Sequence, residues 1–351
     1  MNTAEKQILA RRREKPFIVS DLHMHSMGES VFQYIEIKMH QLLRDENAEK
    51  YDEILVIGSY DRSVIVSEHE KDGKLTNWQR PTAEVFENKL ILKCFPGKDY
   101  VRHYASLVAS YFALQGKRSD HVSYILPTEK ECWTAVDSLA LETVEVTDAV
   151  VLGVELFNFT DENTIWQGDD EIFWATERLE SGKQVTYLIV QFSFWADILY
   201  RIVHKIAKLG HKKVIFTAKL GGIAEDIIPN ATLATGNTGY INGQFIKWKN
   251  VFEKSKSDLL MKGSHINSPS VLFEVSEWVN YFHKFTFVDS EVGYFALAAK
   301  EANLDFGYMH FVSNNLTKIH DEDLSNERSI EVLEKRKKLN AEIQRLIKEV
   351  I

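Results

Sequence analysis

Cysteine is scarce in this chain, with only Cys94 and Cys132 among 351 residues, and neither lies in a CxxC pair or beside a run of histidines. This scarcity excludes a disulfide framework and a cysteine-rich zinc site, so we expect two reduced, buried thiols. Long apolar runs are absent as well. No segment is long enough to cross a bilayer, and the first residues lack the apolar core of a signal peptide. The sequence therefore predicts a cytoplasmic protein without a membrane partner.

An excess of basic residues is also lacking. The chain has 42 Lys and Arg residues against 51 Asp and Glu residues, which gives a formal net charge of −9. A general nucleic-acid binder needs a basic face that displaces counterions from phosphates. The charge balance therefore argues against nucleic acid as a partner and favours a protein that acts on a small molecule.

The apolar content of 44% is enough for a substantial core, and apolar runs alternate with amphipathic stretches. This alternation predicts an α/β fold. We expect strands at residues 54–59, 89–95, 122–127, 149–157 and 185–191, and a strand in 17–25. We expect helices at residues 31–43, 171–179 and 321–351.

The most informative stretch is residues 285–316, which reads as strand, helix, strand. The first strand delivers Asp289 and Glu291 to the start of the helix, and the second ends in Ser313 and Asn314. Because the strand tips of an open α/β sheet face one crevice, we expect Glu291 and Asn314 to converge on one small molecule. Against this interpretation, a carboxylate in the first turn of a helix is more often a capping group.

The residues VDSE, the small-residue helix and FVSNN resemble a segment of the nucleoside phosphorylase and nucleosidase superfamily, which reads V-D/G-M-E, an alanine-rich helix and a strand ending in S-D or T-N. In that family the glutamate binds the ribose hydroxyls, and the Asp or Asn holds the base. The resemblance implies that Glu291 is the ribose residue and Asn314 the base residue. It places Ser290, where the family has methionine, and Ser313 in the same substrate site.

Two further stretches agree in order with this family: residues 207–234, which contain VIFTAKLGG, and residues 264–273, SHINSPSVLF. The second implies that Leu272 or Phe273 stacks on the base. The resemblance implies a three-layer fold with a central mixed sheet flanked by helices over residues 87–351. Residues 1–86 are then an N-terminal extension that can contribute to the sheet. We also expect a homo-oligomer.

An anion site is expected where a proline–glycine turn ending at Gly97 leads into a helix with Arg102 and His103 in its opening turn. Free N–H groups and the positive end of the helix dipole suit such a junction to phosphate. The turn is similar to the family's P-G-D-P-x-R loop, although Arg102 lies one position late and residues 54–59 compete for the family's first strand. Lys219 either adds a charge there or fills the site and abolishes phosphorolysis. An exposed, solvated Arg or Lys is the commoner outcome.

A rival interpretation starts from Asp21, His23 and His25, a D-x-H-x-H pattern. Alternate residues of an extended segment point the same way, so the two imidazoles could share a metal. The pattern resembles the first motif of polymerase-and-histidinol-phosphatase metal hydrolases, but the later matches, His69 and Glu155, are poor. The first interpretation expects no metal and no other cofactor, with inorganic phosphate as an alternative co-substrate.

Three functions follow from these patterns. The family resemblance implies an enzyme that cleaves the N-ribosidic bond of a purine-type nucleoside, with phosphate or water as nucleophile. Asn314 can hydrogen-bond the base but cannot transfer a proton to it. A second interpretation is a catalytically silent nucleoside-binding or sensing protein, because Ser290, Lys219 and the bulky segment FSFWADI at 192–198 depart from the family. The third is the metal-dependent hydrolase.

Overall fold

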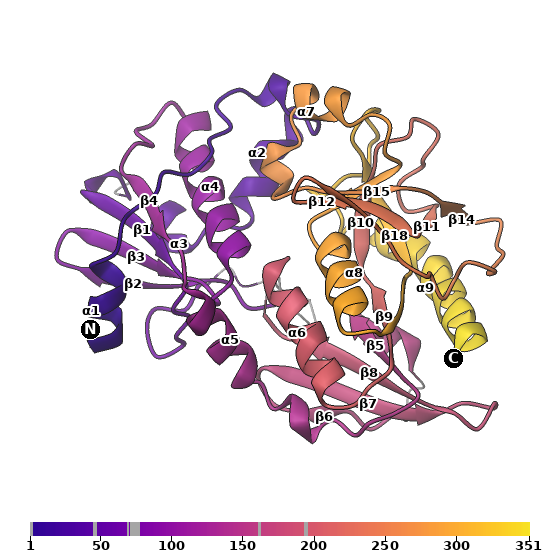
Figure 1. Cartoon of the computed structure of the whole chain (residues 1–351). Helices are drawn as coiled ribbons and strands as arrows, with labels where there is room; N and C mark the ends of the chain where they lie inside the picture. Colours follow the sequence, from indigo (N-terminus) through magenta and orange to yellow (C-terminus); the bar gives the residue numbers. More distant parts are fainter. Residues whose placement is uncertain (1–2, 45–47, 69, 71–77, 161–162, 193–195) are drawn as a thin grey trace.

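The structure, a computed structural model, describes residues 3–44, 48–68, 70, 78–160, 163–192 and 196–351. Its strands form three sheets flanked by helices (Figure 1). The mixed α/β architecture expected from the sequence is confirmed, but the strands do not form a single central sheet. Among the helices in the described ranges, none is long and apolar enough to cross a membrane.

The N-terminal sheet has four strands in the order β2-β3-β1-β4. These are β1 (Glu53–Ile57), β2 (Thr82–Phe86), β3 (Lys89–Lys93) and β4 (Val122–Ile125). Its central strands read as continuous apolar runs because both faces are covered. Ile54 and Val56 of β1 share a cluster with helix α4 (Lys98–Leu114), whereas Leu55 and Ile57 pack with Ile8 of α1 (Thr3–Leu9). The boundary expected between residues 86 and 87 lies in the turn that joins β2 and β3.

The remaining strands form a six-stranded and an eight-stranded sheet. The six-stranded order is β17-β9-β5-β8-β7-β6, and the eight-stranded order is β13-β12-β15-β16-β10-β18-β11-β14. The six strands are β5 (Ala149–Gly153), β6 (Gln167–Gly168), β7 (Ile172–Arg178), β8 (Gln184–Val190), β9 (Lys213–Thr217) and β17 (Asp305–Tyr308). The eight are β10 (Lys219–Gly222), β11 (Leu233–Thr235), β12 (Thr238–Ile241), β13 (Gln244–Lys247), β14 (Leu260–Lys262), β15 (His265–Asn267), β16 (Phe287–Asp289) and β18 (His310–Asn315).

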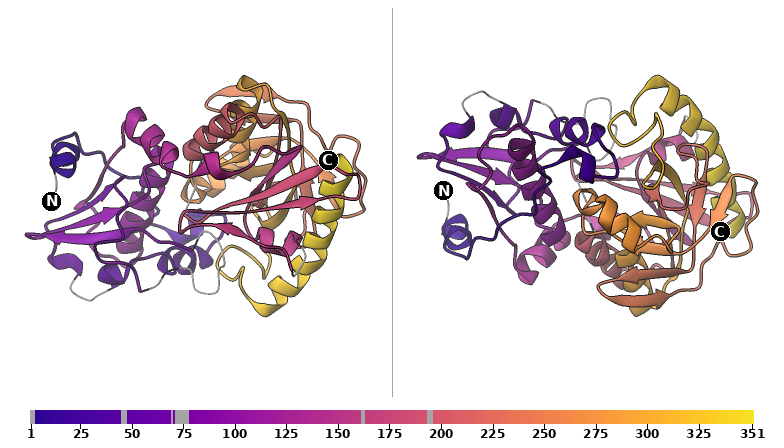
Figure 2. Two further views of the ribbon diagram at one scale, coloured as in Figure 1. Left: turned by 90° about the horizontal axis from the view of Figure 1, so that it is seen from below. Right: turned by 90° about the horizontal axis from the view of Figure 1, so that it is seen from above.

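The two larger sheets are joined by strands that continue from one into the other. Only Ala218 separates β9 from β10, and only Met309 separates β17 from β18. Residues Val150 and Leu152 of β5 share a cluster with α6 (Asp197–Lys208) and α8 (Val292–Glu301), whereas Val151 packs with α9 (Ile330–Val350) on the other face. Helices therefore cover both faces of the six-stranded sheet, and Figure 2 shows α9 along the outer side of this half.

The other helices are short. They are α2 (Ser30–Glu36), α3 (Gln41–Arg44), α5 (Glu129–Asp137) and α7 (Ser276–Tyr281), with 3-10 helices at Leu22–Met24, Ala48–Lys50, Leu141–Thr143, Leu156–Phe159 and Val271–Phe273. The strand–helix–strand prediction for residues 285–316 is confirmed by β16, α8 and the pair β17 and β18.

Four expected elements need correction. Residues 172–178 form strand β7, not the helix expected at residues 171–179, because their backbone pairs with β8 along seven residues. The segment 17–25 contains a 3-10 turn and no strand, residues 31–43 divide into α2 and α3, and the C-terminal helix begins at Ile330, where Ser329 caps it.

Candidate functional site

A cavity of about 570 Å³ lies between the N-terminal sheet's helix α4 and the eight-stranded sheet. One side, which we call the N-terminal wall, consists of Tyr34, Lys38, Arg80, Tyr100, His103 and Tyr104. The opposite side includes Lys219, Gly221, Asp289, Ser290, Glu291, Ser313 and Asn314. Six of the residues expected from the sequence therefore line one cavity: Glu291, Asn314, Ser290, Ser313, His103 and Lys219.

Glu291 and Asn314 line this cavity, but the strands that position them do not run in the expected directions. Strand β10 pairs antiparallel with β16 and parallel with β18, so β16 and β18 run in opposite directions and their tips do not share an edge. Instead, Gly221 of β10 lies opposite Val288 on one side and Asn314 on the other. Strands are spaced about 5 Å apart, so Val288 and Asn314 lie about 10 Å from each other. Neighbouring side chains pack closely around Gly221, since an added Cβ would lie 2.7 Å from Leu316 Cδ1 and 3.0 Å from Val288 Cγ1.

Asn314, which lines the cavity, follows a bulge in β18. The register with β10 shifts between Leu220 and Gly221, which leaves Ser313 as the additional residue. The Ser313 hydroxyl lies 3.1 Å from the Leu220 carbonyl oxygen and 2.8 Å from Asn314 Oδ1, so it can donate to either acceptor. Both side chains are buried, and this contact fixes the orientation of the amide.

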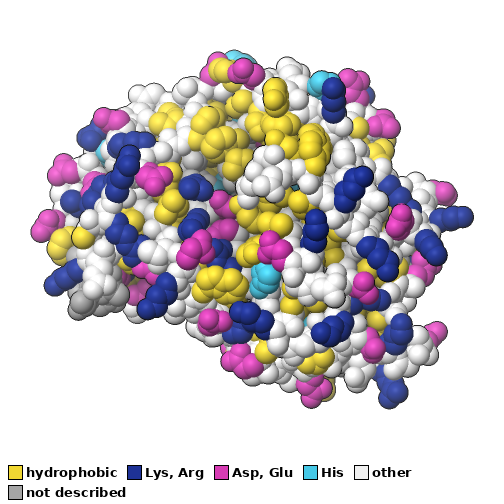
Figure 3. Space-filling view, in the orientation of Figure 1, with side chains coloured by type: hydrophobic (Ala, Val, Ile, Leu, Met, Phe, Trp, Pro, Cys, Tyr) yellow, Lys and Arg dark blue, Asp and Glu magenta, His cyan; other side chains and the backbone are white. Residues whose placement is uncertain are grey.

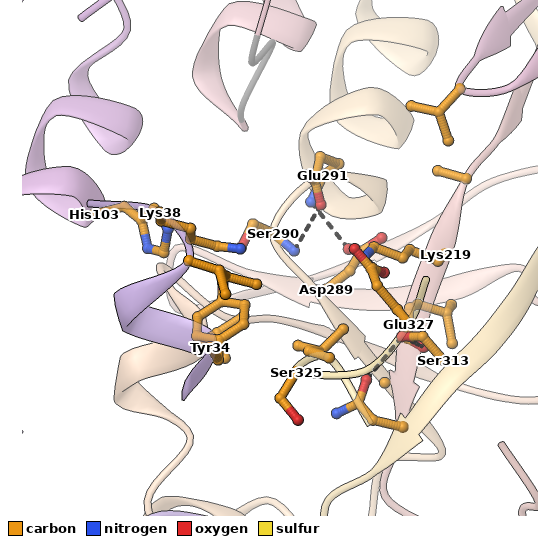
Figure 4. A pocket seen from close by; sticks show the side chains of 18 of the residues that line it. Tyr34, Lys38, His103, Lys219, Asp289, Ser290, Glu291, Ser313, Ser325 and Glu327 are labelled. Carbon is orange, nitrogen blue, oxygen red and sulfur yellow. Dashed lines mark hydrogen bonds and ion pairs between the residues drawn. The ribbon is translucent and has the colours of Figure 1, made fainter. Parts of the chain in front are cut away.

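Asp289, not Glu291, caps helix α8. Its Oδ1 accepts hydrogen bonds from the backbone N–H groups of Glu291, at 3.0 Å, and Val292, at 2.9 Å. The carboxylate of Glu291 turns to the cavity wall and accepts from the Ser290 N–H at 3.0 Å (Figure 4). Burial, together with the charge of Asp289, raises the pKa of Glu291 above its usual value. The capping role that the sequence left open for Glu291 therefore belongs to its neighbour.

Two buried histidines lie behind Asp289. His265 Nε2 is 2.7 Å from Asp289 Oδ1, and His310 Nε2 is 3.8 Å from Asp289 Oδ2. Burial opposes ionisation of Asp289, but His265 and then His310 hold its pKa below the usual value. Burial lowers the pKa of His310 to about 4. Asp289 is therefore a buried negative charge at the cavity wall. Sequence reasoning missed His265 and His310 because each is a single histidine in an ordinary strand.

Lys219 forms an ion pair with Glu327, which belongs to the segment before α9 (Figure 4). Glu327 Oε2 also lies 3.8 Å from Nη2 of the buried Arg336. The segment 324–329 lines the cavity beside them. The charge that Lys219 brings to the strand tip is therefore matched by a carboxylate of the same chain.

The four-residue anion site expected from the sequence is not formed. Gly97 and Arg102 are not among the described residues that line the cavity, whereas His103 and Lys219 lie on opposite sides of it. Arg102 is half-exposed, and its Nη1 lies 3.4 Å from Asp99. An added Cβ on Gly97 would lie 2.7 Å from Ile198, so this turn faces helix α6.

The N-terminus of α4 already holds an anion, and that anion is a protein carboxylate. The backbone N–H groups of Lys98 and Asp99 donate to Asp197 at 3.2 and 3.3 Å. Arg201 Nη1 lies 2.8 Å from the same carboxylate. The positive end of the helix dipole is thus neutralised internally, which explains why this junction does not form a phosphate site.

The two candidates for stacking on the base are also displaced. Leu272 is fully buried in the cluster around α4, and Phe273 stacks on Phe17 with ring centroids 4.3 Å apart. Phe273 borders a separate groove with Trp278 and Phe282. Figure 3 shows hydrophobic side chains gathered around α7, close to this part of the fold. Val271, the residue before Leu272, lines the main cavity instead.

The metal interpretation of Asp21, His23 and His25 is not supported by their arrangement. Asp21 Oδ1 accepts the His23 N–H at 2.9 Å, and His23 is exposed. His25 is buried, with Nε2 2.9 Å from the Val271 carbonyl and Nδ1 accepting from the Met27 N–H at 3.2 Å. Within the described ranges, no three His, Cys, Asp or Glu side chains are grouped so that they could hold a metal ion. Of the two later matches to the metal motif, His69 lies outside the described residues, and Glu155 precedes the 3-10 helix Leu156–Phe159.

Apart from His103, the N-terminal wall was not predicted from the sequence. Lys38 Nζ lies 3.8 Å from the centroid of the Tyr34 ring, a cation–π contact between residues four apart. Glu274, from the loop after the 3-10 helix at 271–273, also lines the cavity, and burial raises its pKa to about 8. Besides the motif that contains His103, the spacing of Tyr100 and Tyr104 is a sequence signal for this wall, because it places both on one face of α4.

The bulky segment FSFWADI is described only in part. Phe192 stacks on Phe95 with ring centroids 3.6 Å apart, so it packs in the interior. Phe194 and Trp195 lie outside the described residues.

Comparison with known proteins gives distant likenesses. No known family profile matches the chain. The chain is 27% identical to the oxidoreductase cns1 of Cordyceps militaris in an alignment of 148 residues that covers 37% of this chain. It spans about a fifth of that protein, 18% of its length.

Solved structures similar to the chain include nucleoside phosphorylases and nucleosidases. Uridine phosphorylase from Vibrio fischeri is 13% identical, with 60% of this chain and 90% of that chain covered and a TM-score of 0.46. The 5′-methylthioadenosine/S-adenosylhomocysteine nucleosidase from Neisseria meningitidis is 14% identical, with 57% of this chain and 97% of that chain covered and a TM-score of 0.43. A mutant of futalosine hydrolase from Helicobacter pylori is 13% identical, with 58% of this chain and 98% of that chain covered and a TM-score of 0.43.

Proposed function

We propose that the protein is a nucleosidase-type enzyme that cleaves the N-ribosidic bond of a purine-type nucleoside, with water as the nucleophile. The observation that carries the proposal is that Glu291, which follows β16, and Asn314 of β18 line one cavity, with β10 paired between the two strands. In the superfamily that the motifs resemble, these two positions hold the ribose and the base.

Water is the proposed nucleophile because the residues expected to bind phosphate do not converge. Asp197 fills the start of α4, and Lys219 is paired with Glu327. Phosphorolysis needs a bound dianion beside the sugar, so neutralising both candidate sites disfavours it. Inorganic phosphate is therefore not required as a co-substrate in this proposal.

Each residue has a specific role in the proposed reaction. Glu291 holds the ribose hydroxyls, and Asn314 hydrogen-bonds the base through its amide. The sugar gains positive charge as the bond to the base breaks, and the buried negative charge of Asp289 stabilises it. Cytoplasmic location and assembly into a homo-oligomer remain part of this proposal.

The test is base release from a panel of purine nucleosides, with and without phosphate. We expect release that does not depend on phosphate and that falls at least about 100-fold in Glu291→Ala, as expected when a group that orients the reacting sugar is removed. Glu277→Ala is the matched control, because Glu277 lies in the first turn of another helix, α7, and is exposed. Undiminished base release in Glu291→Ala would contradict the proposal.

The second candidate is a nucleoside-binding protein without turnover. The pairing of Lys219 with Glu327 favours it, because this pair lies at the strand tip where the nucleophile is expected. Tight nucleoside binding by calorimetry, lost in Glu291→Ala and accompanied by no base release, would support this candidate over the enzyme.

A further inference from the structure

Two cations converge on one carboxylate at the edge of the cavity. Glu327, from the segment before α9, forms an ion pair with Lys219, and the same oxygen, Oε2, lies 3.8 Å from Nη2 of Arg336. Arg336 is only 4% exposed, and its Nη2 has no hydrogen-bond partner among the described residues. Two cationic donors that approach one oxygen form a place suited to an anion, and the protein supplies that anion itself.

This place lies beside the residues proposed to hold the sugar. The antiparallel register of β10 with β16, continued past the end of β16, sets Lys219 opposite Ser290, the residue before Glu291. Lys219, Glu291 and Glu327 line the same cavity (Figure 4). Burial and the charge of Asp289 raise the pKa of Glu291, and the charge of Lys219 opposes them, so Lys219 acts directly on this carboxyl. An anion held by Lys219 would therefore lie next to the sugar.

The segment that carries Glu327 is anchored on both sides. Before it, Asp323 accepts a hydrogen bond from the Ser30 hydroxyl of α2. After it, Ser329 caps the start of α9. Because the flanking backbone is held in this way, little further conformational entropy is lost when the carboxylate meets Lys219.

Arg336 keeps its positive charge at neutral pH. Burial lowers its pKa to about 10, although the carboxylates of Glu155 and Glu322 oppose that effect. The guanidinium is therefore a permanent cation behind Glu327. A phosphate oxygen within hydrogen-bond distance would satisfy the Nη2 donor, which the Glu327 carboxylate approaches only to 3.8 Å.

The other carboxyl groups that line the cavity are accounted for elsewhere. Glu70 pairs with an arginine at 2.8 Å, and Asp289 lies 2.7 Å from a histidine. Burial raises the pKa of Glu274 to about 8, and burial with the charge of Asp289 raises that of Glu291, so both favour the neutral form. Glu327 is thus the cavity carboxylate that contacts Lys219 in the described structure.

We propose that Glu327 determines which nucleophile the enzyme uses. Its carboxylate occupies the place beside Lys219 and Arg336 that a phosphate dianion would take, and it thereby restricts the reaction to water. The inference rests on the proposed function for the reaction, whereas the place for an anion rests on the two cations.

The two nucleophiles give different products. In both reactions the bond from C1′ to the base breaks, and its electron pair leaves with the base. In hydrolysis the water oxygen bonds to C1′, and the base takes up the proton that the water gives up. With phosphate, one oxygen of the hydrogen phosphate dianion bonds to C1′ and its proton goes to the base, so the product is a sugar 1-phosphate.

The first test is calorimetry with inorganic phosphate on the full-length protein, a measurement that needs no turnover. Glu327→Ala removes the carboxylate and leaves room for an anion. We expect phosphate to bind this variant at least about tenfold more tightly than the unmodified protein, because one charge-assisted hydrogen bond is sufficient for such a factor. Glu327→Ser makes the same room and should give the same gain. Equal phosphate affinity in the unmodified protein and both variants would overturn the inference.

Glu331→Ala is the matched control, because Glu331 is an exposed glutamate in the first turn of α9. It should bind phosphate as the unmodified protein does. Adding Lys219→Gln to Glu327→Ala should abolish the gain, and a gain that persists in this double variant would contradict the assigned place.

The product identifies the nucleophile. With a purine nucleoside and phosphate, we expect free sugar from the unmodified protein and a sugar 1-phosphate from Glu327→Ala, detected by phosphorus NMR. Free sugar as the sole product of both proteins would refute the inference and leave the proposed function intact. Tighter phosphate binding by Glu327→Ala without base release by either protein supports the exclusion of phosphate by Glu327, an outcome in which only the proposed reaction fails.

Discussion

Replacing Asp289 by Asn tests the buried charge behind the candidate site. An asparagine of nearly the same shape can still accept the N–H groups of Glu291 and Val292 through Oδ1. It cannot provide the negative charge that His265 contacts at 2.7 Å. The substitution therefore removes the electrostatic interaction and leaves the cap of α8 in place.

The expected cost follows from the buried charged contact. Hydrogen bonds to charged groups contribute about 1.5–3 kcal/mol, so we expect Asp289→Asn to lower the free energy of unfolding by about that amount at pH 7. The pKa of Asp289 is below its usual value in the folded protein. The stabilisation is therefore present above the unfolded pKa of about 3.9 and is lost as the pH falls through the folded value.

Urea unfolding at pH 7 measures this cost, with Asp305→Asn as the control because Asp305 is an exposed aspartate at the start of β17. Glu291 provides a second readout. Since the charge of Asp289 helps to raise the pKa of Glu291, the acid limb of the pH dependence of ligand binding should move to lower pH in Asp289→Asn. An unchanged unfolding free energy together with an unchanged acid limb would refute the electrostatic role of Asp289.

Two further substitutions test other parts of the arrangement. Gly221→Ala would place a Cβ 2.7 Å from Leu316 Cδ1, so we expect a loss of about 1–3 kcal/mol in unfolding free energy and weaker nucleoside binding by calorimetry. Unaltered binding would show that the close packing around Gly221 does not shape the cavity. Asp197→Ala removes the anion that caps α4, so we expect a loss of about 0.5–2 kcal/mol by urea unfolding. Phosphate-stimulated base release in Asp197→Ala but not in the unmodified protein would show that this carboxylate fills a phosphate site.

Local patterns were sufficient to predict the elements around residues 285–316. Apolar runs and a small-residue helix have a direct physical correspondence to buried strands and a buried helix, and β16, α8 and β18 follow them. Glu291 and Asn314 were located because they end such elements. The strand directions were not predicted, because a local sequence does not specify which neighbour a strand pairs with.

The helix expected at residues 171–179 illustrates a limit of the same kind. Ile172 and Ala175 are three apart, a spacing that suits a helical face, but Phe173 and Trp174 favour a pleated surface. The segment forms a strand because seven of its residues pair with β8. Tertiary pairing overrides a weak local preference here, as it commonly does for short amphipathic segments.

The start of α4 shows most clearly why function needs the assembled fold. The sequence correctly places free N–H groups after Gly97, and such groups attract an anion. The sequence does not specify which anion binds there. Asp197, one hundred residues along the chain, supplies the carboxylate, and Arg201 holds it in place. Because Asp197 accepts from these N–H groups, the start of α4 is closed to a phosphate, and only the assembled fold shows this.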